Sequence, residues 1–304
     1  MTCNEHSDQI YNTQNNGTYN DVYQENRDEF LHLKECDELA VFLQKVAPLH
    51  SKHCHFTTMD KFAKICKSER FRFSSAYSTN DLQEVFEKGD RDQWEHIYSV
   101  SFSHGDNNNF GMWRMYGGNC QYEALCLEFS ENAVENWKEE ILQKKDVRTE
   151  EDKKCSSKRI SVSFHDIAYI HGRQEKKAEN VCWGNIINSD IAKAIADTNH
   201  RIMNNEKGIS KNTRLTGFVK NSAWEQEKES RIMIKLPSLK QNSFISVPVG
   251  SLLDNVKIYF SPFSKLGTQE SIALLQHFFR VNGSSLPKEH EKNCCSSYFK
   301  YLVQ

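Results

Sequence analysis

Short segments with the alternation of a β-strand recur along this sequence, and short helical segments lie between them. In residues 53–57 polar side chains alternate with Cys54 and Phe56, so a strand here would have one polar and one apolar face. Residues 60–67 instead have apolar positions at helical spacing. No long β-α-β rhythm and no G-x-G-x-x-G or Walker A loop is present. The pattern therefore predicts an α+β fold with a mixed or mainly antiparallel sheet and flanking helices.

The same periodicities predict the remaining elements. Strands are expected at residues 71–73, 96–103, 122–129, 162–170, 227–236, 244–247 and 256–260. Helices are expected before Pro48 and at residues 130–143, 180–205 and 268–279, and a compact helix or turn at 110–116.

The chain divides by composition into an arm and one domain. Residues 1–26 are rich in Asn, Gln, Thr, Asp and Tyr, which predicts a disordered N-terminal arm. Residues 27–304 are expected to form a single α+β domain, since the 18 Phe and 11 Tyr of the chain supply enough large apolar side chain for a packed core. The mixed-charge run at 144–159 predicts a charged loop insertion.

Charge and cysteine usage exclude several classes of protein. The formal net charge of −2 gives no overall field that would attract nucleic acid or an anionic membrane. No stretch reaches the roughly 18 apolar residues that span a bilayer, and residues 1–26 lack the features of a secretory signal. None of the 10 cysteines shows C-x-x-C spacing, so they are expected to be reduced thiols. We therefore expect a cytoplasmic protein with no membrane partner and no bound metal.

Candidate site residues lie in two segments far apart in the sequence. His55 and Thr57 share the polar face of the first strand, and Glu227, Glu229 and Arg231 alternate along a later one. Two carboxylates and a guanidinium on one face can bind a polar ligand, or they can form an ion-pair ladder that adds little stability. The histidine can equally be a strand-end residue bonded to a backbone carbonyl or to Thr57. Both interpretations stay open.

An aromatic segment follows at residues 110–116. Its Trp113, Arg114 and Tyr116 can stack on a base, and the guanidinium can pair with phosphate. An aromatic cluster before Gly117 is also typical of a core plug, which is our interpretation for the tryptophan. The role of the arginine stays open.

Four motifs in order resemble a known family. They are His55-Phe56-Thr57, Phe73-Ser74-Ser75 before Asn80-Asp81, Ser101-Phe102-Ser103 before Met112-Trp113-Arg114-Met115-Tyr116, and Trp224 with Glu227-Lys228-Glu229-Ser230-Arg231. Over roughly residues 50–280 they resemble the bacterial domain of unknown function 2971 family. Two departures are visible, because Phe56 stands where Tyr is usual and Ser230 where an aromatic residue is usual.

The first motif, with the helix and strand after it, also resembles the start of ADP-ribosyltransferase-like domains. In those folds a first-strand His or Arg holds NAD and a late-strand Glu carries the chemistry. The resemblance implies that His55 bonds the ribose or carboxamide, that Glu229 stabilises the charge formed as nicotinamide leaves, and that Glu227 assists the acceptor. It also implies that Thr57, Arg114, Tyr116 and Arg231 contribute to cofactor binding. Tyr77, Trp113 and Tyr116 compete for the place stacked on nicotinamide.

Two functions of different classes follow. The resemblance implies an NAD-using, ADP-ribosyltransferase-like enzyme in a toxin or phage-defence setting, acting on a protein or nucleic-acid acceptor. The alternative is a non-catalytic binding or sensor module for a nucleotide-like small molecule. A metal-dependent nuclease is a weaker third hypothesis, because the available His and Glu residues show no recognisable ligand spacing. The transferase hypothesis requires that His55 and Glu229 face one cleft.

Overall fold

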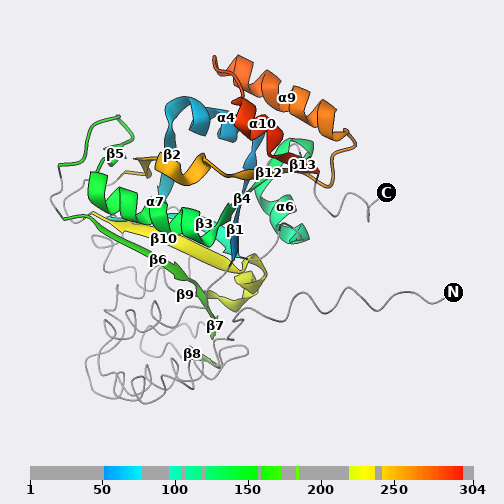
Figure 1. Cartoon of the computed structure of the whole chain (residues 1–304). Helices are drawn as coiled ribbons and strands as arrows, with labels where there is room; N and C mark the ends of the chain where they lie inside the picture. The colour runs from blue at the N-terminus through cyan, green and yellow to red at the C-terminus, as the bar shows by residue number, and fades with distance from the viewer. Residues whose placement is uncertain are drawn as a thin grey trace, which may run out of the picture.

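A computed structural model describes residues 51–76, 96–104, 107, 109–117, 121–156, 159–172, 183–184, 219–236 and 242–296 (Figure 1). The expected arm at 1–26, the helix before Pro48, Tyr77 and the Asn80-Asp81 motif lie outside the described residues. The expected helix at 180–205 is described only at Trp183–Gly184, which form strand β8. No helix among the described residues is long and apolar enough to cross a membrane.

Most described strands belong to one large sheet. Its main path has the order β13-β12-β4-β1-β3-β2-β11-β5, and β10 lies between β3 and β6. Every pair in it is antiparallel except β12 with β13, so the predicted α+β class is confirmed. The strands are β1 Lys52–Thr58, β2 Arg70–Ser75, β3 Ile97–His104, β4 Ala124–Ser130, β5 Arg148–Thr149, β6 Ser161–Asp166, β10 Glu229–Lys235, β11 Phe244–Pro248, β12 Lys257–Phe260 and β13 Cys294–Ser296.

A second, small sheet is formed by strands that lie between β6 and β10 in the sequence. It contains β7 (Ala168–Gly172), β8 and β9 (Val219–Asn221) in the order β8-β7-β9. The chain passes from β6 into β7, and it returns from β9 to β10 through the 3₁₀ helix η5 (Ser222–Glu227). The two connections are joined where the Ile167 amide donates to the Glu229 carbonyl at 2.8 Å.

The large sheet forks at β3. One edge of β3 pairs with β10 from Ile97 to Ser103. The other edge is shared, because β1 pairs near Ser103 while β2 pairs near Ser99. The middle of β3 therefore has β10 on one side and the opening of the fork on the other.

Helices cover the two faces of the sheet unequally. On one face, α4 (Met59–Ser68), α7 (Glu131–Lys144) and α9 (Thr268–Val281) bury the main core. On the other face, α6 (Phe110–Tyr116) buries a smaller cluster. The short helix α10 (Lys288–Lys292) and a 3₁₀ turn, η6 (Gly250–Leu253), complete the C-terminal part. The main core holds Phe62, Phe73, Phe102, Trp137 and Phe279, and the smaller cluster holds Cys54, Phe56, Met112, Trp113, Ala124 and Cys126.

Two expected segments differ from the structure. The expected strand at 227–236 begins at Glu229, because Lys228 adopts a left-handed φ of 43° and ends the extended run. The expected charged loop at 144–159 includes β5, which pairs with β11, and a fully buried Val147. Part of that segment therefore forms an edge of the sheet.

Candidate functional site

Strand β10 and strand β3 place four polar side chains on one face of the sheet. Glu229 lies opposite Ser103 and Arg231 lies opposite Ser101. Directly opposed residues of an antiparallel pair point to the same face. Ser230, between the two charged residues, therefore points to the opposite face, where its hydroxyl donates to Asp166 at 2.7 Å. We call this opposite face, which α4, α7 and α9 cover, the helix-covered face.

A buried ion cluster forms around Glu229. Lys220 Nζ lies 2.5 Å from Glu227 Oε2 and 3.2 Å from Glu229 Oε2. Arg231 donates to Glu229 Oε1 from Nε at 2.9 Å and from Nη2 at 2.7 Å. Each of these four residues is less than a tenth exposed. We call Lys220, Glu227, Glu229 and Arg231 the ion cluster; its formal charges cancel.

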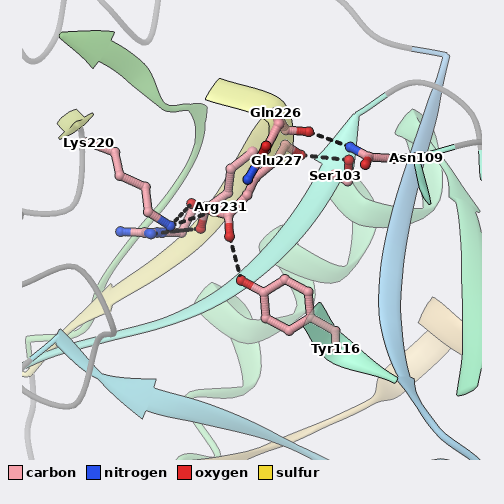
Figure 2. Close-up of polar contacts among 8 residues, drawn as sticks. Ser103, Asn109, Tyr116, Lys220, Gln226, Glu227 and Arg231 are labelled. Carbon is pink, nitrogen blue, oxygen red and sulfur yellow. Dashed lines mark hydrogen bonds and ion pairs between the residues drawn. The ribbon is translucent and has the colours of Figure 1, made fainter. Parts of the chain in front are cut away.

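Helix α6 and strand β3 hold the turn that carries Glu227 (Figure 2). Tyr116 Oη donates to Glu227 Oε1 at 2.6 Å, and Ser103 Oγ donates to the Glu227 carbonyl at 2.7 Å. The side-chain amide of Asn109 donates to the carbonyl of Gln226. Three groups from outside η5 therefore fix the end of η5 just before β10.

The backbone at Lys228 allows both carboxylates to reach one ammonium. In an ideal strand, Glu227 and Glu229 would be two positions apart on one face. Here the left-handed φ of 43° at the intervening lysine turns η5 into β10, and that lysine is itself exposed. Such a conformation is costly for a non-glycine residue and is found more often at functional sites than elsewhere.

The pKa values of the site follow from its burial and its charges. Burial by itself would raise the pKa of Glu229, but Arg231, Lys220 and a hydrogen bond from the Ser101 hydroxyl hold it below its usual value. Burial, together with the Glu227 carboxylate, raises the pKa of Tyr116 well above its usual value. At neutral pH Glu229 is therefore ionised and the Tyr116 phenol is protonated, so the phenol is the donor in its bond to Glu227.

His55 does not reach this cluster. Cys54 lies opposite Ser103 and shares the face of Glu229, so the next residue, His55, points to the helix-covered face. There the His55 ring packs edge-on against Phe71 at 4.9 Å. The predicted pairing of His55 with Glu229 in one cleft is therefore wrong, because the register between β1 and β3 separates them by the thickness of the sheet.

The ring of His55 instead fills the fork of the sheet. Its Nδ1 donates to the backbone carbonyl of Ser101 at 3.0 Å, and burial lowers the pKa of the imidazole to about 4. The interpretation as a strand histidine bonded to a backbone carbonyl is thus confirmed. Thr57 shares the helix-covered face by alternation and is 3% exposed, so it also lies away from the ion cluster.

Helix α6 separates the other two expected cofactor residues. Tyr116 points inward to Glu227, whereas Arg114 is exposed and lies over the rings of Phe110 at 5.0 Å and Phe263 at 5.4 Å. Trp113 is fully buried, which confirms its interpretation as a core residue. The structure thus brings together Glu227, Glu229, Arg231 and Tyr116 from the predicted set, and leaves out His55, Thr57 and Arg114.

Sequence reasoning missed Lys220 and Asn109. The lysine comes from strand β9 of the small sheet, and no pattern in its own segment relates it to the two glutamates. The asparagine belongs to a run that predicts a loop, although its position just before the aromatic helix is that of an N-cap, and its Oδ1 accepts from the Met112 amide at 3.2 Å. The N-cap preference of Asn is the signal that could have identified it.

Metal binding finds no support in the part of the chain that the structure describes. No group of three or more His, Cys, Asp and Glu side chains there is arranged to hold a metal ion. The two carboxylates of the ion cluster are instead neutralised by Lys220 and Arg231.

Comparison with known proteins finds one similarity, to a family model over part of the chain. A family model described as protein of unknown function (DUF2971) matches residues 112–232. Neither the curated proteins nor the solved structures contain a match to the chain. The matched segment includes Tyr116 and the whole ion cluster, whereas His55 lies before it. Over residues 112–232 the chain is therefore similar to the DUF2971 family, a family of unknown function.

Proposed function

We propose that the protein binds a nucleotide-like ligand on the sheet face that carries the ion cluster. One observation carries the proposal: Ser101, an exposed residue, lies directly opposite Arg231 on the face of the ion cluster, and its hydroxyl lowers the pKa of the buried Glu229 carboxylate. The buried charges are thereby connected to the surface through a group that can exchange its partner for a ligand atom. Ribose hydroxyls and carboxamides, which both donate and accept hydrogen bonds, match such a group.

The surface around Ser101 is polar over several positions. Ser99, Ser101 and Ser103 alternate along β3 on one face, while Tyr98, Val100 and Phe102 on the other face are buried in the core. Exposure is greatest in the middle of the row, because Ser101 is exposed, Ser99 is half-buried and Ser103 is buried. A few fixed polar groups on a rigid strand can orient a small polar ligand.

The ion cluster is better explained by function than by stability. Burying two carboxylates and two cations has a desolvation cost of several kcal/mol per ion, which their mutual attraction offsets only with excellent geometry. Apolar residues of similar volume often stabilise a fold equally well. Buried charges with shifted pKa values, beside an exposed hydroxyl and a left-handed backbone residue, are typical of binding and catalytic sites.

Binding is favoured over ADP-ribosyl transfer by the state of Glu229. Lys220 and Arg231 both neutralise this carboxylate, so little charge is left to stabilise a developing cation. His55, which the transferase hypothesis places on NAD, lies on the opposite face. NAD remains the ligand we expect first, and transfer to a protein or nucleic-acid acceptor, the toxin or phage-defence setting and the cytoplasmic location remain predictions.

The test is calorimetric titration of the purified full-length chain with NAD, ADP-ribose and ADP, combined with an assay for nicotinamide release from labelled NAD. We expect binding without release, and binding weakened about tenfold in Ser101→Ala and in Glu229→Gln, which is about 1.4 kcal/mol. The serine variant is included because its side chain is exposed and its loss spares the fold. Glu289→Gln, at an exposed position on α10, is the matched control.

Three results would argue against the proposal. Absence of binding by all three nucleotides would refute it. Binding unaffected by Ser101→Ala and Glu229→Gln would place the ligand elsewhere on the molecule. Nicotinamide release that Glu229→Gln abolishes would establish the transferase instead.

A further inference from the structure

We infer that Arg72, stacked on Phe244 beside Ser74 and Ser99, is a phosphate-binding subsite that selects ligands carrying a diphosphate. The inference rests on the proposed function and specifies which part of a nucleotide the sheet face recognises. It concerns strands β2 and β11, which lie beyond β3 on the side away from β10 (Figure 1).

The guanidinium of Arg72 is held in a fixed plane. Its Cζ lies 3.4 Å from the centroid of the Phe244 ring. In the register of β2 and β11, Arg72 is opposite Ser246 and Phe244 is opposite Ser74. The arginine side chain therefore runs diagonally along the sheet toward Ser74. A stacked guanidinium loses less rotational freedom on binding and still presents its N–H donors at the edge of its plane.

The donors of Arg72 are not used within the described part of the chain. The residue is exposed, and among described residues it has the ring contact but no hydrogen bond or ion pair. The charges of Arg72 and Glu150 attract each other, and the Glu150 carboxylate itself accepts from the Ser243 and Phe244 amides. Phosphate oxygens are the usual bidentate partners of such a guanidinium.

Arg70, two positions earlier on the same strand, provides the internal contrast. Its guanidinium pairs with Asp146 at 3.2 Å and also donates to the backbone carbonyls of Asp146 and Ser246. This arginine ties three segments of the fold together. Among the described residues Arg72 makes no such ion pair or hydrogen bond, and the Glu150 charge acts on it without direct pairing.

A row of polar residues leads from Arg72 to the ion cluster, with the buried Met233 opposite Ser99 beside it. Ser74 lies directly opposite Ser99, and Ser99 and Ser103 are four positions apart on β3, about 13 Å at the rise of a strand. A ligand whose ribose meets Ser101 and Glu229 would extend its phosphates along the strand toward Ser99, Ser74 and Arg72. Hydroxyls donate to phosphate oxygens as the guanidinium does, so the subsite selects a nucleoside diphosphate over a nucleoside.

The experiment compares ADP, adenosine and pyrophosphate as calorimetric ligands of the full-length wild type, Arg72→Gln, Arg72→Lys and Lys235→Gln. Lys235 is an exposed lysine on the same face, opposite Ile97, so its variant removes the same charge without touching the stack. We expect Arg72→Gln to weaken ADP and pyrophosphate about tenfold and leave adenosine unchanged. Arg72→Lys should fall between, since it keeps the charge but loses the planar fork, and Lys235→Gln should resemble the wild type.

The outcomes separate this inference from the proposed function. If ADP binds the wild type and Arg72→Gln equally well, the subsite is refuted and nucleotide binding stands. If Lys235→Gln weakens ADP as much as Arg72→Gln does, the effect is general charge and the subsite is again refuted. If pyrophosphate binds through Arg72 but no nucleotide binds, the subsite stands and the proposed function fails.

Discussion

The protonation state of His55 depends on its position in the fork of the sheet. Strands β1 and β2 diverge on one edge of β3, and the imidazole satisfies the Ser101 carbonyl that the opening leaves there. Such a bond contributes about 0.5–1.5 kcal/mol to stability. The bond needs a proton on Nδ1, which neutral imidazole supplies, and burial among Phe71 and Phe102 disfavours the charged form.

The protonation of His55 should make the fold sensitive to acid. Its pKa is about 4 in the folded chain against 6.5 for the ordinary group, so the unfolded chain binds more protons between these values. The contribution of His55 to the free energy of unfolding should therefore be fully present above pH 6.5. It should be lost as the pH drops to 4, which lowers the free energy of unfolding by at most about 3 kcal/mol. His55→Asn keeps an amide donor near the position of Nδ1 but cannot titrate. Urea unfolding at pH 7, 6, 5 and 4.5 should show a shallower fall in the variant, and parallel curves would contradict the assignment.

At the scale of elements, local patterns predict individual helices and strands well. The helix expected at 60–67 is Met59–Ser68 in the structure, and the one expected at 268–279 is Thr268–Val281. Amphipathic spacing and N-cap residues are local signals, so the sequence carries them directly. The strand expected at 227–236 is shorter, because the left-handed Lys228 is imposed by contacts of η5 with β3 and α6.

The arrangement of the site depended on information that local patterns do not hold. Alternation along one strand correctly puts Glu229 and Arg231 on one face. It cannot say which face of β1 matches it, because that depends on the register of β1 with β3, and so His55 was placed wrongly. Lys220 comes from a different sheet, and its contact with the glutamates exists only once the two sheets are joined.

Asn109 couples helix α6 to the turn η5 and can be tested with two substitutions. Its Oδ1 caps α6 and its Nδ2 donates to the Gln226 carbonyl. Asn109→Ala should lower the free energy of unfolding by about 2 kcal/mol, because a cap and a hydrogen bond are each worth about 1 kcal/mol. Asn109→Ser keeps a capping oxygen on a shorter side chain and should lose about 1 kcal/mol. Equal losses in urea unfolding would mean that the cap contributes nothing, and wild-type stability in both would refute the coupling.

At the scale of the whole molecule, one core joins segments from both ends of the described chain. The Phe62 ring on α4 meets the Phe279 ring on α9 at 5.8 Å, and Asn282 donates to Asp60 at 3.1 Å. Strand β12 pairs with β4, which pairs with β1. Elements separated by more than two hundred positions in sequence therefore depend on one another, and the single domain at residues 27–304 stays a prediction.

That dependence predicts a single unfolding transition even when helix α9 alone is weakened. Phe279 is fully buried, and Phe279→Ala should lower the free energy of unfolding by about 3–4 kcal/mol through lost burial and the cavity left behind. Val281→Ala, on the same helix but 67% exposed, should change it by less than about 0.5 kcal/mol. Tryptophan fluorescence and far-UV circular dichroism should give the same midpoint in urea for each protein, since a cooperative unit loses secondary and tertiary structure together. Separate midpoints in Phe279→Ala would show that α9 and the strands it covers unfold apart from the rest, and the ligand face on β3 and β10 would then belong to an independent unit.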